Sequence, residues 1–118
     1  MPAQTEPNSG IKYGYTVGES GWASDMDANL LWIGRAGAQL MVKDRDLATP
    51  PGSPANGDRY IVAASGAGAW AGQDAKVAVW NGSAWVFYTP KIGWLAYLED
   101  EQKITAYKAT GWSAGVAI

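Results

Sequence analysis

The chain of 118 residues contains neither cysteine nor histidine. Without cysteine no disulfide can form, and the redox compartment of the protein is left unconstrained. Without histidine the chain lacks the commonest metal ligand and the usual general base at neutral pH. These two absences exclude zinc sites of the common kind and the Ser-His and Cys-His nucleophile systems.

Positive charge and long apolar runs are also scarce. Nine Lys and Arg stand against eleven Asp and Glu, which gives a formal net charge of −2, and the basic residues are scattered. Binding to phosphates needs clustered Lys and Arg, so nucleic acid is excluded as a partner. No apolar run approaches the roughly 18 residues of a membrane span, and the first ten residues lack the features of a signal peptide. We therefore expect no membrane insertion. Because signal-peptide features are lacking, we expect that the protein would leave a cell by lysis.

Aromatic residues and glycine are abundant, with seven Trp, six Tyr and 15 Gly. A proline-rich loop, DLATPPGSPANGDRY, precedes a region of short segments rich in Val, Ile and aromatic residues. The sequence predicts a mainly β fold: a small antiparallel sheet or barrel-like domain of short hairpins over residues 43–118. The expected strands are RYIVAA, AKVAVW, WVFYT, GWLAYL and KITAYK, and NGSA and EDEQ are the expected hairpin turns.

The N-terminal part divides into an arm and a helix. Residues 1–20 contain several Gly and Pro and are predicted to form a flexible, extended arm that anchors the chain to a larger partner. Within the arm, IKYGYTV is a candidate strand that needs a partner. Residues 21–42 are predicted to form one helix with Ser24 as N-cap. Gly34 and Gly37 each weaken it by about 1 kcal/mol relative to alanine.

One turn of the predicted helix is apolar on every side, because four apolar residues follow one another in LLWI. Two alternatives follow: the helix covers the sheet of its own domain, or it joins copies of the chain in a homo-oligomer, for which we expect a homotrimer. The candidate oligomer contacts are Met26, Leu30, Leu31, Trp32, Ile33 and Leu40.

The acidic residues offer little for catalysis or metal binding. Most lie in expected turns or at the start of the helix, where carboxylates ordinarily cap the helix or are solvated. We therefore expect no enzyme activity and no catalytic residues. Asp44-x-Asp46 has the spacing of an oxygen-ligand site, but it alternates with Lys43 and Arg45 and no EF-hand loop follows. We predict neither a metal nor a cofactor.

Glycan binding is the second candidate function, because sugars stack their apolar faces on Trp and Tyr. Asn81, Gln73 and Asp74 are candidates for contacts with hydroxyl groups. For each aromatic residue the alternative is packing, and Trp80 and Trp85 would form a cross-strand pair if they face each other across the NGSA hairpin. The candidate glycan-binding residues are Trp70, Trp80, Trp85, Trp94, Tyr107 and Trp112.

Several stretches together resemble a domain family of unknown function that occurs in tail-fibre proteins of phages and in gene transfer agents of alphaproteobacteria. The resemblance covers about residues 21–113. It is carried by GWASDMDANLLWIG, TPPGSPANGDRYIVA, GAWAG, VAVWNGSAWVFYTPKIGWLAYLEDE and AYKATGW.

The resemblance implies a non-enzymatic virion protein, a component of a surface fibre of the tail or head. Such a protein would act in host attachment or particle decoration, would be made in the host cytoplasm and would lie at the virion surface. Its expected partners are other virion proteins through the arm, further copies of itself, and a host surface polysaccharide. The alternative is a carbohydrate-binding module that recognises host glycans through exposed Trp and Tyr.

Overall fold

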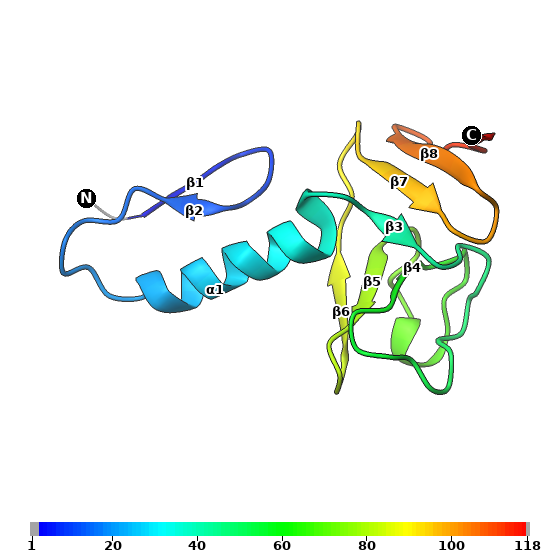
Figure 1. The fold of residues 1–118 in the computed structure, drawn as a ribbon, viewed down its shortest axis with the longest axis horizontal. Helices are drawn as coiled ribbons and strands as arrows, with labels where there is room; N and C mark the ends of the chain where they lie inside the picture. Colours follow the sequence, from blue (N-terminus) through cyan, green and yellow to red (C-terminus); the bar gives the residue numbers. More distant parts are fainter. Residues whose placement is uncertain (1–2, 118) are drawn as a thin grey trace. The chain divides into compact units, whose positions relative to one another are not determined.

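The computed structural model describes residues 3–117, and the chain divides into two units, Met1–Ala38 and Gln39–Ile118 (Figure 1). The fold is mainly β, with three small sheets and one helical segment near the N-terminus. This confirms the fold class predicted from the sequence. Among the described residues, no helix has the length and apolar character that crossing a membrane requires.

The first unit opens with an antiparallel hairpin of β1 (Gln4–Thr5) and β2 (Lys12–Tyr13). Glu6 closes the turn between them, because its carboxylate accepts the backbone N–H of Ser9 at 2.6 Å and the Ser9 hydroxyl at 2.7 Å. These hydrogen bonds from Ser9 lower the pKa of the Glu6 carboxyl to about 2. The strand expected in IKYGYTV thus forms over two residues and pairs within its own chain.

Asn29 fastens this hairpin to the helix. Its Nδ2 donates to the carbonyl of Lys12 at 2.9 Å, and its Oδ1 accepts the backbone N–H of Lys12 at 3.1 Å. The hydroxyl of Tyr15 also donates to the carboxylate of Asp25. Asn29 is consequently buried, although it lies among exposed helix residues.

The helix α1 (Trp22–Trp32) begins after Gly21, whose φ of 89° is a left-handed conformation that glycine adopts without strain. Ser24, predicted as the N-cap, lies inside the first turn, and its hydroxyl donates to the carbonyl of Gly21 at 3.2 Å. The predicted cap is therefore wrong.

The helical segment ends earlier than the sequence predicts. After α1 comes one π-helical turn, η1 (Ile33–Gly37), closed by the N–H of Ala38 bonding to the carbonyl of Ile33 at 3.0 Å. The chain then leaves the helix, and Leu40 enters the core of the second unit with 8% of its surface exposed. Leu40, a candidate oligomer contact, therefore lies outside the helical segment, and the predicted helix end at residue 42 is wrong.

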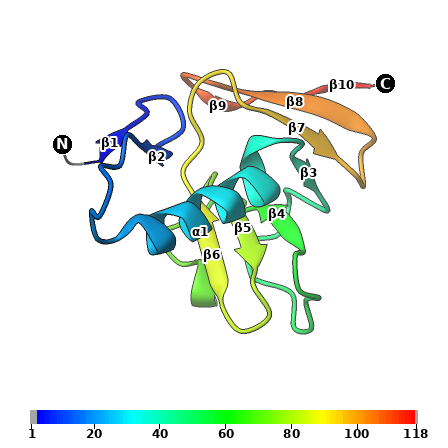
Figure 2. The same ribbon diagram turned by 60° about the vertical axis from the view of Figure 1, so that its left-hand side comes forward.

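The second unit contains short strands in two sheets (Figure 2). The strands are β3 (Met41–Val42), β4 (Arg59–Ile61), β5 (Val77–Trp80), β6 (Trp85–Tyr88), β7 (Leu95–Leu98), β8 (Lys103–Lys108), β9 (Gly111–Trp112) and β10 (Val116–Ala117). One sheet has the order β10–β8–β7–β3, with β9 paired to β8, and the other has the order β4–β5–β6. The predicted hairpins at NGSA and EDEQ join β5 to β6 and β7 to β8.

One pairing departs from the antiparallel prediction, because β3 lies parallel to β7, with Met41 opposite Tyr97. The residues after β3 then bond to β4: the N–H of Lys43 donates to the Arg59 carbonyl at 2.8 Å, and the N–H of Ile61 donates to the Asp44 carbonyl at 3.1 Å. The segment around β3 thus connects the two sheets. Over residues 3–117 the strands do not close into a barrel.

Two apolar clusters form the core of this unit. The first takes residues from both sheets, and the second lies on the other face of the three-stranded sheet, where the short helix η2 (Gly68–Trp70) covers it. The first cluster consists of Leu40, Val42, Ile61, Val77, Val79, Ala96 and Leu98, and the second of Tyr60, Val62, Trp70 and Ala78.

Candidate functional site

The first three candidate glycan-binding residues lie together in one aromatic cluster. Trp70 is fully buried, with ring centroids 5.7 Å from Tyr60 and 5.2 Å from Trp85. Trp80 stands opposite Trp85 across the β5–β6 hairpin, at a centroid distance of 5.2 Å. The predicted cross-strand pair is therefore confirmed. A ring with no exposed surface has no face for a sugar, so Trp70 is removed from the set of candidate glycan contacts.

The other three candidates lie at the five-stranded sheet. Tyr107 and Trp112 face each other across β8 and β9 with ring centroids 5.2 Å apart. The indole N–H of Trp112 donates to the carbonyl of Ala75 at 2.8 Å, and Trp94 and Trp112 pack against the first core cluster. These three rings are half-buried. Their main contacts are with the protein itself.

Two of the three polar residues expected beside the aromatic rings, Asn81 and Asp74, hold turns, whereas Gln73 Oε1 is buried without a hydrogen-bond partner among the described residues. Asn81 Oδ1 accepts the backbone N–H groups of Ser83 and Ala84 at 2.9 and 2.8 Å, which fixes the β5–β6 turn. The Asp74 carboxylate accepts the N–H groups of Ser65 and Gly66 at 2.9 and 2.8 Å. These hydrogen bonds lower the pKa of Asp74, and the one from Gly66 has the larger effect. Both side chains hold loops, and neither is arranged with the rings as a sugar site.

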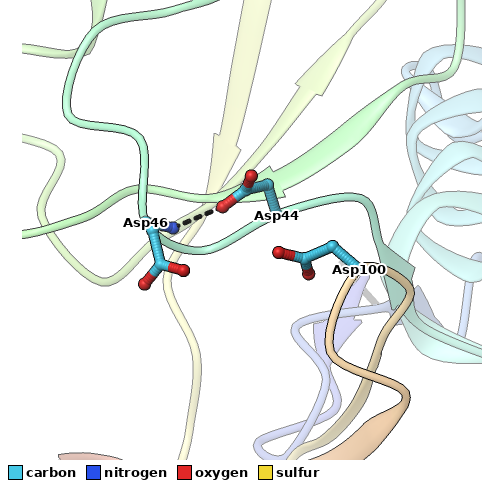
Figure 3. Close-up of side chains that lie close together, drawn as sticks. All are labelled: Asp44, Asp46 and Asp100. Carbon is cyan, nitrogen blue, oxygen red and sulfur yellow. Dashed lines mark hydrogen bonds between the residues drawn. The ribbon is translucent and has the colours of Figure 1, made fainter.

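Three carboxylates gather at one end of the five-stranded sheet (Figure 3). The ligand atoms of Asp44, Asp46 and Asp100 lie within 4.8 Å of one another, and the N–H of Asp46 donates to Asp44 Oδ1 at 2.7 Å. Partial burial, and then the negative charge of Asp44, raise the pKa of Asp100. The first two residues were visible as an Asp-x-Asp pattern, whereas Asp100 comes from the turn after β7. Exposed carboxylates often gather without a metal, and no other feature of the described residues indicates one here.

Arg45 does not neutralise this cluster as the alternating charges suggested. Its guanidinium pairs with Glu101, with Nε 2.9 Å from Oε2, and donates to the carbonyls of Ser113 and Ala114 at 2.6 Å each. The hydrogen bond from Arg45 lowers the pKa of Glu101. Arg45 therefore joins the loop after β3 to the β7–β8 turn and to the segment before β10.

The helix presents the largest set of exposed apolar side chains in the first unit. Trp22, Met26, Leu30 and Ile33 fall within about 80° of one another around the helix axis, given 100° per residue. Their exposed fractions are 57%, 43%, 59% and 42%. We call these four residues the apolar stripe. Leu31, 48% exposed, lies on the opposite side of the helix, and Trp32 is half-buried.

One family model matches the chain. No curated protein and no solved structure matches the sequence. The family described as "Protein of unknown function (DUF2793)" matches residues 26–113, from the middle of α1 to the end of β9. Because this match covers more than half of the chain, the protein belongs to the DUF2793 family.

Proposed function

We propose that this chain is a non-enzymatic structural protein of a virion, a component of a tail or head fibre that acts in host attachment or particle decoration. The apolar stripe of α1 is the observation that carries the proposal. Four large apolar side chains on one exposed helix face suit a protein that works by assembly. The resemblance to a domain family of tail-fibre proteins and gene transfer agents is the reason for proposing that the assembly is a phage-like particle.

The exposed part of the stripe provides apolar surface for joining copies of the chain. Full burial of a side chain of this size contributes roughly 1.5–3 kcal/mol, and about half of each is still exposed, so the four contribute about 3–6 kcal/mol per chain against the entropy lost on association. We propose that the stripe joins chains into a homotrimer, in line with the three-fold symmetry expected for fibres.

The N-terminal hairpin is the proposed attachment to other virion proteins. A two-stranded hairpin is marginal by itself, and here it is stabilised by the bonds between Asn29 and Lys12. Both β1 and β2 are edge strands of their sheet. Edge strands accept a strand from a partner through backbone hydrogen bonds, which gives the arm a physical means of anchoring.

The second unit supplies the exposed body of the proposed fibre component. Its aromatic residues stabilise the two sheets, as the ring contacts of Trp70, Trp85 and Trp112 illustrate. A polysaccharide contact would use the half-buried rings at the hairpin ends, of which Trp80 and Tyr107 lie outside the two core clusters.

The proposal is tested by locating the chain in particles from the cells that produce it. We expect the protein to co-purify with the particles and to account for density at a surface fibre. A variant that starts at Gly21 and lacks the arm is expected to fold but to be missing from the particles. A chain found only outside particles would contradict the proposal.

A glycan array with the purified chain separates the structural role from the carbohydrate-binding module. The absence of binding to any glycan would leave a purely structural role. Binding that is lost in Trp80→Ala and Tyr107→Ala, with the thermal midpoint unchanged, would favour the module instead.

A further inference from the structure

The five-stranded sheet has an apolar outer face in addition to its buried inner face. Val42, Ala96, Leu98 and Thr105 face the core, and each is at most 1% exposed. Successive side chains of a strand point to opposite sides, so the residues between them face away from the core. This outer face consists of Met41, Leu95, Tyr97, Ile104, Ala106 and Val116.

The strand register places these residues side by side. Val116, Ile104, Tyr97 and Met41 form one row across β10, β8, β7 and β3, and Leu95 stands opposite Ala106 in the next row. Figure 2 shows β7, β8 and β10 as neighbours along one layer. Val116 is 70% exposed, Leu95 62% and Ile104 38%.

An apolar outer face is unusual for a sheet of this kind. A mostly antiparallel sheet with one face in water normally alternates apolar and polar residues. Here β7 reads LAYL, with apolar residues on both faces. Leu95, Ile104 and Val116 are exposed while Met41, Tyr97 and Ala106 are half-buried, and exposed apolar residues gathered on one face indicate contact with another surface.

Charged residues mark the two ends of the outer face with opposite signs. Glu99 follows β7 on the same side as Leu95 and Tyr97, and its N–H still bonds to the Val42 carbonyl at 2.9 Å. Lys108 ends β8 on the same side as Ile104, at the opposite end of the sheet. Lys43 lies in the same row as Glu99, but its Nζ is 3.6 Å from Asp58, so this ion pair offsets the charge of Lys43 and Glu99 leaves this end negative.

We propose that the outer face binds the outer face of a second copy of the chain. The two copies would be related by a two-fold axis that lies in the interface and crosses the strands. Such an axis stacks β8 on β8 in opposite directions and places the Lys108 end of each copy over the Glu99 end of the other. The face is then complementary to itself in charge, as a two-fold contact requires.

The area of the face sets the strength of this contact. The four strands β3, β7, β8 and β10 have 2, 4, 6 and 2 residues, and at about 3.3 Å per residue and 4.8 Å between strands they cover roughly 220 Å². A stable complex usually buries about 800 Å² on each partner. The contact is therefore weak between isolated chains and gains strength where copies are held at high local concentration, as in an assembly. It is separate from the helix contact, because it uses none of the residues of the apolar stripe.

A single introduced cysteine reports the contact cleanly, because the natural chain has none. Ile104→Cys places a thiol near the proposed axis, and a bismaleimide spacer of about 10 Å matches the usual distance between packed sheets. Val17→Cys is the matched control, since Val17 is fully exposed in a loop of the first unit. At the highest soluble concentration, and after correction for labelling by a single maleimide, we expect cross-linking at position 104 to be at least about tenfold faster. Equal rates would overturn the proposal.

Charge exchange then tests the orientation of the two copies. In the Ile104→Cys background, Glu99→Lys and Lys108→Glu each place like charges opposite one another, so each single change slows cross-linking. The double variant restores the opposite charges and is expected to restore the rate. If the double variant stays as slow as the single variants, the two-fold arrangement is wrong.

Discussion

At the scale of single residues, Gly66 occupies a position with no room for a side chain. A Cβ there would lie 2.5 Å from the carbonyl oxygen of Trp70 and 3.1 Å from both Asp74 Oδ1 and Val62 Cγ1. The carbonyl belongs to the backbone beneath the buried Trp70 ring and cannot move independently. We predict that Gly66→Ala lowers the free energy of unfolding by about 1–3 kcal/mol.

Gly52→Ala is the control for this prediction. Gly52 lies in the proline-rich loop of the same unit, where an added Cβ would have nothing within 4 Å and where φ is not left-handed. Its substitution is expected to change the free energy of unfolding by less than about 0.5 kcal/mol. Urea unfolding of both variants gives the comparison, and equal effects would show that crowding at Gly66 is not the cause.

Asp74 predicts a specific dependence of stability on pH. Its pKa is lowered in the folded protein by the N–H groups of Gly66 and Ser65, so folding favours the ionised carboxylate. The stabilisation is fully present above the pKa of the unfolded chain and disappears as the pH falls through the folded pKa. Asp74→Asn should therefore lower the urea midpoint near about pH 7, and its difference from the natural chain should shrink as the pH falls below the unfolded pKa of about 3.9.

The exposed Asp27 of α1 provides the control, because Asp27→Asn changes the same charge without removing the loop contacts. A difference between Asp74→Asn and the natural chain that stays constant down to low pH would contradict the argument. It would mean that the negative charge of the Asp74 carboxylate is not what stabilises the natural chain.

The aromatic residues show how far single residues can be interpreted from the sequence. The pair Trp80–Trp85 was predictable, because a four-residue turn signal separates two residues that an antiparallel hairpin must bring together. The burial of Trp70 was not predictable. Its partners Tyr60 and Trp85 lie on two different strands, and only the assembled three-stranded sheet brings them to one place.

At the scale of elements, the two glycines of the helical segment have opposite roles. Gly34 has nothing within 4 Å of its missing side chain, whereas the Trp32 ring occupies the space at Gly37. We predict that Gly34→Ala stabilises the helix by up to about 1 kcal/mol, because alanine is the better helix former. Gly37→Ala is expected to destabilise it by about 1–3 kcal/mol, because the ring must move.

Far-UV circular dichroism with thermal unfolding distinguishes the two variants. Helical signal should rise or be retained in Gly34→Ala and fall in Gly37→Ala. The same direction of change in both variants would show that helix propensity alone governs this segment.

The end of the helix explains the main error in predicting the elements. The apolar spacing of Ile33 and Leu40 fitted a continued helix, and neither residue type specifies a strand. The segment ends at Gly37, where the Trp32 ring of the preceding turn occupies the space of a side chain, and the parallel pairing of β3 with β7 places Leu40 in the core. The first is local packing within the helical segment and the second is a tertiary effect, and apolar periodicity reports neither. The hairpins were predicted correctly because their turns are local in the sequence.

At the scale of the whole molecule, the exposed apolar residues form two different surfaces, one on a helix and one on a sheet. The apolar stripe lies on a helix of the first unit, and the outer face lies on a sheet of the second. Aromatic side chains, which are the usual anchors of recognition, are mostly committed to packing within the second unit. In the second unit the large apolar side chains that are exposed are aliphatic, namely Ile92, Leu95, Ile104 and Val116, and we expect them to serve assembly rather than ligand capture.

The last prediction concerns the oligomeric state. If the apolar stripe joins three copies, a charge in its centre must be buried without a partner, which costs several kcal/mol and prevents association. Leu30→Asp and Ile33→Asp are therefore expected to give monomers in light scattering, while the natural chain gives a trimer at micromolar concentration. Both side chains are exposed in the isolated chain, so far-UV circular dichroism should show the fold unchanged. Val17→Asp introduces the same charge at a fully exposed site away from the stripe and should leave the trimer intact. A natural chain that is monomeric under these conditions would contradict the prediction, and assembly would then depend on the particle itself.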